Sequence, residues 1–131
     1  MIGKNNPLNI RFNKSNYWKG LLGSTRGFCD FSSEFYGIRA AFYLIIRSYR
    51  KVRKDVTYHD IIWRYAPPLE NNTHRYIEFV TDKLGVFPWD VPATFKEFSL
   101  LIYWMSVFEG NRITLTDEYL NKLEKEFKKY I

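Results

Sequence analysis

The stretch SSEFYGIRAAFYLIIRSY (residues 32–49) decides the fold class. Its large apolar residues recur at steps of three and four, the spacing that aligns side chains along one face of an α-helix. These positions are Phe35, Ile38, Phe42, Ile45, Ile46 and Tyr49. A long helix with so apolar a face belongs in a protein core, so we expect a mostly α-helical chain built around it.

Helix start and stop signals flank this stretch on its C-terminal side. Thr57 and Asp60 resemble a capping box that opens a helix of about two turns before Pro67. A further helix runs from Asn72 or Thr73 to a stop at Gly85. The remaining predictions are a helix over 95–108 and a last helix that starts at Thr116. The capping pair Thr94 and Glu97 opens the helix over 95–108, and Gly110 and Asn111 close it.

The first 31 residues carry a different pattern. They are rich in Gly, Asn and Ser, with short apolar pieces between them, so we expect an irregular lobe with a small β-hairpin. The fold class is therefore α+β, mostly α, with about five helices. A length of 131 residues predicts one domain over 1–131.

Composition narrows the classes of function. Hydrophobic residues make up 46% and charged residues 26%, which excludes a disordered tail or a filament. Twenty Lys and Arg against 14 Asp and Glu leave a net charge of +6, which favours a polyanionic partner such as nucleic acid, an anionic envelope polymer or a membrane surface. Aromatic residues reach 19%, an excess that core packing or sugar stacking could explain.

Several classes of site lack their residue patterns. His59 and His74 have no ligand-like spacing, so we expect no metal, and no glycine-rich loop indicates a nucleotide cofactor. Cys29 stands alone in an apolar run, which favours a buried core residue over a nucleophile. No apolar run is long enough to be a signal peptide or a membrane span. We expect a soluble chain made in the cytoplasm, without integral membrane association.

The basic run RSYRKVRK (residues 47–54) has two interpretations. Cations interleaved with Tyr49 suit a nucleic-acid surface. Cations also stabilise the C-terminal end of a helix, and no nucleic-acid motif accompanies the run. We favour the helix end and do not expect a nucleic-acid partner.

The segment WRYAPPLENNTHRYIEFV (residues 63–80) concentrates groups that suit a sugar polymer. Trp63 and Tyr76 offer rings that can stack on pyranoses. Glu70 could protonate a glycosidic oxygen if its pKa were raised. The hydrogen-bonding side chains that follow it are Asn71, Asn72 and Thr73. The alternative is that Asn72 or Thr73 caps a helix and Glu70 favours its dipole.

Glu109, at the end of the predicted helix over 95–108, is the second carboxylate that rigid packing could position. The alternative interpretation of Glu109 is an ordinary solvent-exposed residue at a helix end. Glu70 and Glu109 are thus the candidate catalytic residues.

Several motifs, taken in order, resemble a family of small phage and prophage proteins described as virion structural proteins. They include NNPLNIR (5–11), WKG (18–20), APPLENNT (66–73) and FEGN (108–111). The Asn-rich start is also distantly similar to flagellar-type glucosaminidases, and the ENNT piece to lytic transglycosylases. This second likeness implies a lysozyme-like domain that acts on peptidoglycan.

The resemblance also implies roles for individual residues. In the lysozyme-like enzymes the acidic residue precedes the Asn-rich motif, whereas residues 1–4 include no acid. The matching carboxylates here are Glu70, the favoured general acid, and Glu109. The positions implied as structural or substrate-binding are Asn9, Arg11, Trp18, Arg39, Asn71, Asn72, Thr73 and Tyr76. Arg39, inside an apolar helix, would pair with one of these carboxylates.

Two functions are therefore expected. The first is binding and cleavage of the peptidoglycan glycan strand, as a muramidase, glucosaminidase or lytic transglycosylase. The alternative is a non-catalytic virion or envelope-associated protein that binds glycan or protein partners, including virion proteins. In both cases we expect action at the bacterial envelope or within a virion.

Overall fold

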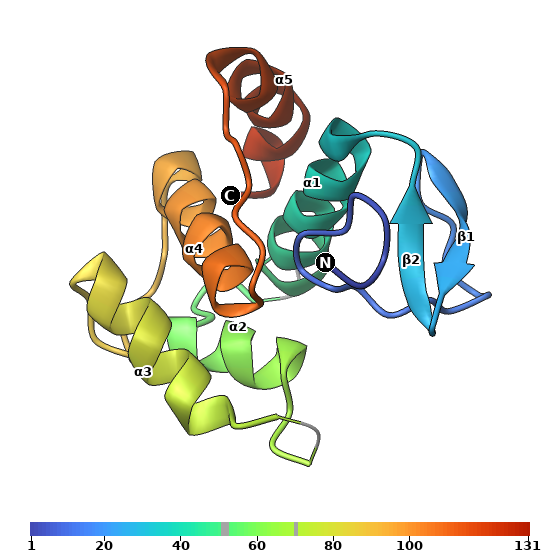
Figure 1. Cartoon of the computed structure of the whole chain (residues 1–131). Helices are drawn as coiled ribbons and strands as arrows, with labels where there is room; N and C mark the ends of the chain where they lie inside the picture. Colours follow the sequence, from blue (N-terminus) through green and yellow to red (C-terminus); the bar gives the residue numbers. More distant parts are fainter. Residues whose placement is uncertain (51–52, 70) are drawn as a thin grey trace.

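The computed structural model describes residues 1–50, 53–69 and 71–131. After an irregular N-terminal segment, β1 (Leu21–Thr25) and β2 (Phe28–Phe31) form an antiparallel hairpin (Figure 1). Arg26 and Gly27 form its two-residue turn, and both have positive φ, at 53° and 84°. That backbone matches the twist of the flanking strands. The small β-containing lobe predicted from the sequence is confirmed.

Five α-helices make up most of the remaining structure: α1 (Glu34–Phe42), α2 (Tyr58–Tyr65), α3 (Thr73–Leu84), α4 (Phe95–Phe108) and α5 (Asp117–Phe127). Both predicted capping boxes are present, Thr57 with Asp60 and Thr94 with Glu97. A short 3-10 turn, η2 (Lys128–Tyr130), follows α5. The mostly α, α+β class is therefore confirmed.

The long helix predicted after Ser32 changes character halfway. It continues from α1 as a π-helix, η1 (Tyr43–Arg50). The steps of three and four are those of an α-helix, and nothing in this spacing signals the wider i→i+5 turns of a π-helix, which is a rare form.

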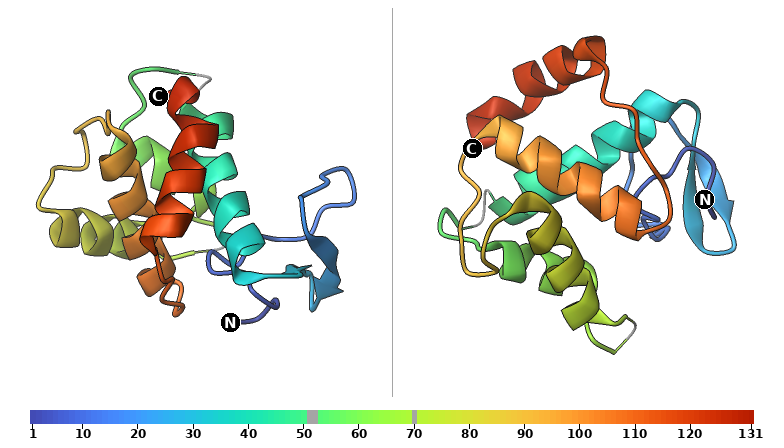
Figure 2. Two further views of the ribbon diagram at one scale, coloured as in Figure 1. Left: turned by 90° about the horizontal axis from the view of Figure 1, so that it is seen from above. Right: turned by 60° about the vertical axis from the view of Figure 1, so that its left-hand side comes forward.

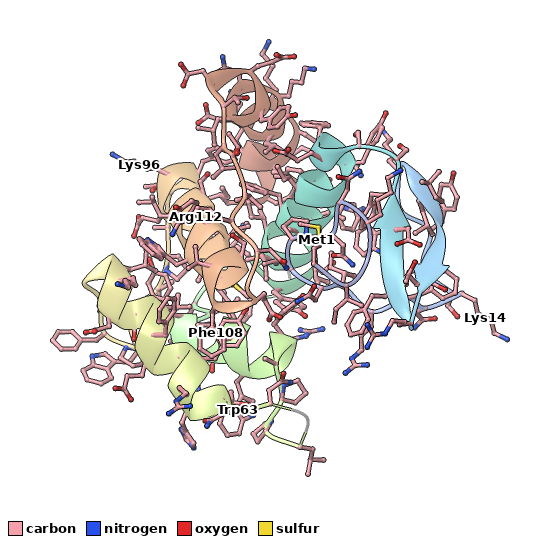
Figure 3. The ribbon with its side chains drawn as sticks, viewed as in Figure 1. Met1, Lys14, Trp63, Lys96, Phe108 and Arg112 are labelled. Atoms are coloured by element: carbon pink, nitrogen blue, oxygen red, sulfur yellow. The ribbon has the colours of Figure 1, made fainter. Side chains whose placement is uncertain are left out.

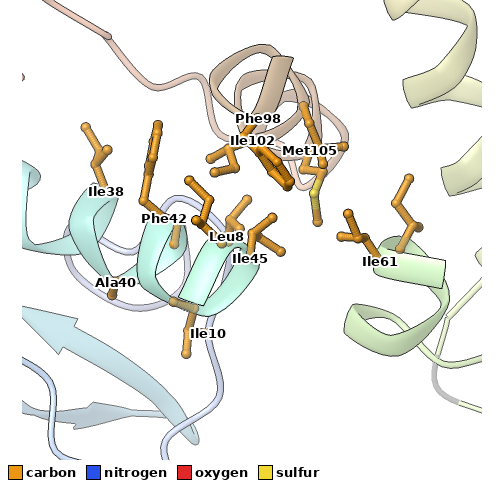
Figure 4. Close-up of a cluster of buried hydrophobic side chains, with 14 of the residues drawn as sticks. Leu8, Ile10, Ile38, Ala40, Phe42, Ile45, Ile61, Phe98, Ile102 and Met105 are labelled. Atoms are coloured by element: carbon orange, nitrogen blue, oxygen red, sulfur yellow. The ribbon is translucent and has the colours of Figure 1, made fainter. Parts of the chain in front are cut away.

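The core forms where α1 and η1 meet α4 and α2. Phe42 and Ile45 face Ile102 of α4, and Ile61 of α2 lies beside this group (Figure 4). Figure 2 shows α5 alongside α1, and α3 alongside α4. Leu8, from the N-terminal segment, also enters the core, with no exposed surface. The segment is thus held in place by burial of its own apolar side chains.

Buried polar contacts fix the conformation of the Asn-rich motif. Asn6 has no exposed surface, and its side chain bonds Ile10 N and O and the carbonyl of Cys29 at 2.8 to 3.0 Å. Gly37 of α1 lies so close that a Cβ there would stand 1.6 Å from the carbonyl oxygen of Asn5. The motif therefore packs directly on the backbone of α1.

Within the described part of the chain, no helix combines the length and apolar character needed to cross a membrane. Across the same residues, no three His, Cys, Asp or Glu side chains are grouped so as to hold a metal ion. Cys29 is buried, and burial raises the pKa of its thiol.

Candidate functional site

A cavity of about 410 Å³ lies between the N-terminal segment, β2, the end of α2 and the end of α4. This is the size range of small-molecule sites in proteins. Four amides line it, from Asn9, Asn13, Asn16 and Asn71. Among its described lining residues the only acid is Glu109. The cavity therefore combines one carboxyl group with many groups that bind hydroxyls.

The end of α4 places the Glu109 side chain. Glu109 is the last residue with helical backbone angles, and Gly110 follows with a φ of 86°. The N–H of Asn111 donates to Ser106 O at 2.8 Å, and that of Gly110 to Val107 O at 3.0 Å. This pair of bonds is the Schellman motif, which needs a residue such as glycine in the left-handed region. The FEGN motif is thus a rigid helix stop that carries a carboxylate.

Asn9 joins this helix stop to the Asn-rich motif. Its Nδ2 donates to Oε1 of Glu109 at 3.1 Å and to the backbone carbonyl of the same residue at 3.3 Å. Asn111 in turn donates to Pro7 O at 2.9 Å and to Oδ1 of Asn9 at 3.3 Å. The motifs at residues 5–11 and 108–111, far apart in sequence, therefore form one hydrogen-bonded unit.

The surroundings of Glu109 favour its protonated form. Burial raises the pKa of Glu109, and hydrogen bonds from Asn9 and Tyr76 oppose that rise. Desolvation penalises the charged carboxylate, so it acts in this direction for any buried acid. A carboxylic acid with a raised pKa in a polar cavity has the property required of a general acid.

Two tyrosines lie beneath the carboxyl group. Tyr76 is 1% exposed, stacks on Phe108, and hydrogen-bonds the Glu109 carboxyl group. Met105 O, 3.3 Å from the hydroxyl of Tyr76, is an alternative acceptor for the same proton. Tyr65 lines the cavity and donates to Leu8 O. Burial raises the pKa of both phenols, so both remain neutral hydrogen-bond donors.

Four of the predicted substrate-binding residues line this cavity: Asn9, Arg11, Trp18 and Asn71. The Arg11 guanidinium lies over the Phe28 ring, 5.2 Å from its centroid. Trp18 is only 7% exposed and meets Tyr43 edge to face at 5.3 Å. Its burial makes it a wall of the cavity rather than an open platform for a sugar.

Other predicted residues have structural contacts. Asn72 caps α3 by accepting from Arg75 N at 3.2 Å. Thr73 is 2% exposed and donates to Ala66 O at 2.5 Å. Trp63 is not part of the cavity lining, because it stacks with His59 at 5.2 Å and lies toward α3 (Figure 3). For Asn72 this is the helix-capping alternative that the sequence left open.

Arg39 has a partner other than the two expected. Its guanidinium forms a two-pronged ion pair with Glu126 of α5, with Nε to Oε1 at 3.0 Å and Nη2 to Oε2 at 2.5 Å. The predicted pairing of Arg39 with a candidate catalytic carboxylate is replaced by this contact. Sequence reasoning missed Glu126 because nothing in a single sequence links α1 to α5.

Glu70, the general acid favoured from the sequence, lies outside the described residues.

In the basic run (residues 47–54), Arg50 is buried and donates to the carbonyl of Lys54. Arg53 pairs with Asp55 at 2.9 Å and Asp60 at 2.5 Å. Arg50 and Arg53 thus bind groups of this chain itself.

Sequence reasoning gave the cavity residues Asn13 and Asn16 no role, and neither belongs to a motif that would have marked it.

Comparison with known proteins gives a likeness to a phage protein. The chain is similar to Protein P5 of Pseudoalteromonas phage PM2, with 37% identity over 89 residues. The alignment covers 65% of this chain and 55% of that protein, so the match spans little more than half of the phage protein. No protein-family model matches the chain. The likeness to a phage protein agrees with the phage part of the resemblance, whereas the lysozyme-like part stays a prediction.

Proposed function

We propose that this chain binds the glycan strand of peptidoglycan and cleaves one of its glycosidic bonds, with Glu109 as the general acid. The observation that supports this most strongly is the position of Glu109. Its carboxyl group is held by Asn9 in a cavity lined with amides, and burial raises its pKa. Amides bond the hydroxyl and N-acetyl groups of sugars, and a raised pKa keeps a proton available for the leaving oxygen.

The chemistry follows from that proton. Glu109 gives it to the glycosidic oxygen while the bond from that oxygen to the anomeric carbon breaks, and the leaving sugar departs as an alcohol. An oxygen nucleophile, from water or from a hydroxyl of the substrate, then bonds to the anomeric carbon. The nucleophile loses a proton in that step. The Glu109 carboxylate, the one acidic group among the described lining residues of the cavity, accepts that proton.

The contact between Asn9 and Glu109 bears on the resemblance to lysozyme-like enzymes. Those enzymes have their acid before the Asn-rich motif in the chain, and residues 1–4 lack one. Here Glu109 contacts the motif through space, from 100 positions later in the sequence. In this proposal Glu109, at the end of α4, takes the role that the acid before the motif has in those enzymes.

The similarity to a phage protein supports a place for this activity in phage infection. A virion that carries the chain would bring it to the bacterial envelope, with other virion proteins as its partners. Such delivery needs no export signal on the chain itself. The match covers 55% of the phage protein, so this setting is part of the proposal.

A second candidate function is a non-catalytic virion or envelope-associated protein. The exposed pair of Phe87 and Trp89 favours it, because the rings stack at 4.8 Å and are 60% and 68% exposed. Large exposed aromatic groups commonly mark sites of protein contact. This pair lies outside the Glu109 cavity, so it could bind a partner without any cleavage.

One experiment separates the two functions. Purified protein is incubated with insoluble peptidoglycan, and the pellet and the soluble muropeptides are analysed from the same tube. The proposed function predicts bound protein together with new soluble fragments. Bound protein without fragments favours the non-catalytic alternative, and neither binding nor fragments contradicts glycan recognition.

A further inference from the structure

A second cavity, of about 460 Å³, adjoins the one that holds Glu109. Asn16, Trp18 and Leu44 line both, so the two cavities meet along these three side chains. The second cavity extends toward α1 and η1, where Tyr43 and Ser48 contribute to its walls. The two cavities are therefore neighbours, with these three side chains at their boundary.

The two cavities differ in charge. Lys19 and Arg39 line the second cavity, and no carboxylate does so among the residues that the structure describes. Arg39 is neutralised by Glu126 and is 11% exposed at its side chain. Lys19 is exposed, and it forms no ion pair within residues 1–50, 53–69 and 71–131. The ammonium group of Lys19 is therefore the cation available to a ligand here.

Tyr17 adds an aromatic surface to the same cavity. Its side chain is 85% exposed, the largest exposure among the aromatic residues that the structure describes. Tyr17 lines the cavity between Asn16 and Trp18, both of which also face the Glu109 cavity. An exposed ring beside hydroxyl and amide groups suits the apolar face of a pyranose.

We propose that this second cavity is a subsite for a carboxylate-bearing sugar of the same strand, with Tyr17 stacking on the ring and Lys19 binding the carboxylate. The inference rests on the proposed function and adds the substrate class, an acidic glycan rather than a neutral one. A nucleic acid fits less well, because every nucleotide carries a phosphate and this subsite offers a single available cation. A glycan strand with a carboxylate on only some of its sugars places fewer negative charges along its length, which suits a subsite with one available cation.

The test uses the Glu109→Gln chain, which retains the shape of the cavity and lacks the acidic proton. Titration calorimetry measures its affinity for two sets of oligosaccharides. One set is neutral N-acetylglucosamine oligomers of two and six sugars. The other is peptidoglycan fragments of the same lengths that carry carboxylates. Tyr17→Ala and Lys19→Gln are added singly to this background.

The subsite predicts a dependence on length and charge. Tyr17→Ala lowers affinity about fivefold for both six-sugar ligands and leaves both two-sugar ligands unchanged. Lys19→Gln lowers affinity about two- to fivefold for the six-sugar acidic ligand alone, and salt reduces that loss. The matched control is Lys14→Gln, whose side chain points outward beyond the hairpin (Figure 3), and it changes no affinity.

Three results would overturn the inference. If Lys19→Gln weakens neutral and acidic ligands equally, or weakens neither, the cavity does not select a carboxylate. A single-stranded DNA oligomer that binds more tightly than the acidic glycan, and through Lys19, would contradict the glycan assignment. In both cases, cleavage by the unmodified chain that is lost in Glu109→Gln still supports Glu109 as the acid. If no oligosaccharide binds at all, the inference and the proposed function both fail.

Discussion

Nδ2 of Asn9 donates a 3.1 Å hydrogen bond to Oε1 of Glu109, joining the start of the chain to the end of α4. The bond orients the carboxyl group, and Asn111 holds Asn9 in turn by donating to its Oδ1. Because Asn9 donates to the charged form of Glu109, it also limits how far burial raises the pKa. The geometry and the acidity of the proposed general acid thus depend on this amide, together with the Tyr76 hydroxyl.

Asn9→Ala is expected to move the pH dependence of cleavage. The variant loses a hydrogen bond that lowers the pKa of Glu109, so that pKa rises further. Since a general acid must be protonated, the alkaline fall in kcat/KM shifts to higher pH. Rates are measured as fragment release across pH, with Asn13→Ala as the control because Asn13 lines the same cavity. An alkaline limb that moves to lower pH in Asn9→Ala would contradict the contact.

Glu109→Gln is expected to stabilise the fold at neutral pH. The folded chain has the raised pKa, so it retains a proton at pH values where the unfolded chain, with a carboxyl pKa of about 4.3, has lost it. The unfolding free energy of the unmodified chain therefore falls as pH rises through this window. The glutamine variant has no carboxyl group to titrate at this position, so its unfolding free energy should fall less over the same pH range.

Urea unfolding at a series of pH values measures this difference. The advantage of Glu109→Gln over the unmodified chain should be smallest below the ordinary carboxyl pKa and largest above the raised one. Glu78→Gln serves as the control, since that side chain is exposed on α3. An advantage that instead shrinks as pH rises would mean that burial does not raise the Glu109 pKa.

Gly37→Ala is expected to destabilise the protein. Alanine favours a helix over glycine by up to about 1 kcal/mol, so helix propensity alone predicts a gain in stability. A Cβ at this position, however, would stand 1.6 Å from the carbonyl oxygen of Asn5, and backbone must move to admit it. We expect a net loss of about 1 to 3 kcal/mol in urea unfolding. A stabilised variant would show that the Asn-rich motif does not pack on α1 in this way.

Local signals predicted the elements well. Thr57, Thr94 and Gly85 mark helix ends in the sequence, and each has the expected capping role in the structure. These signals act within a few residues, so a single sequence contains them in full. The π-helical form of residues 43–50 was not predicted, because the spacing of their apolar residues is that of an α-helix and no local signal marks the wider turns.

The candidate site was only partly predictable. Glu109 and Asn9 were each marked by a motif, but their contact depends on how α4 meets the N-terminal segment. The same limit applies to Arg39, whose partner Glu126 lies 87 positions away. Asn72 and Thr73 show the opposite problem, since residue types suited to sugars also suit helix caps. Residue type suggested the chemistry, and only the tertiary contacts separated site from scaffold.

The central claim is that Glu109 supplies the proton for glycan cleavage. The most direct measurement is chromatography with mass detection of the fragments released from purified peptidoglycan by the unmodified chain, Glu109→Gln, Glu70→Gln and the control Glu78→Gln. We predict that Glu109→Gln lowers release at least about a hundredfold while still sedimenting with peptidoglycan, and that Glu78→Gln releases as much as the unmodified chain. Full release by Glu109→Gln, with release lost in Glu70→Gln, would contradict the account and assign the proton to Glu70.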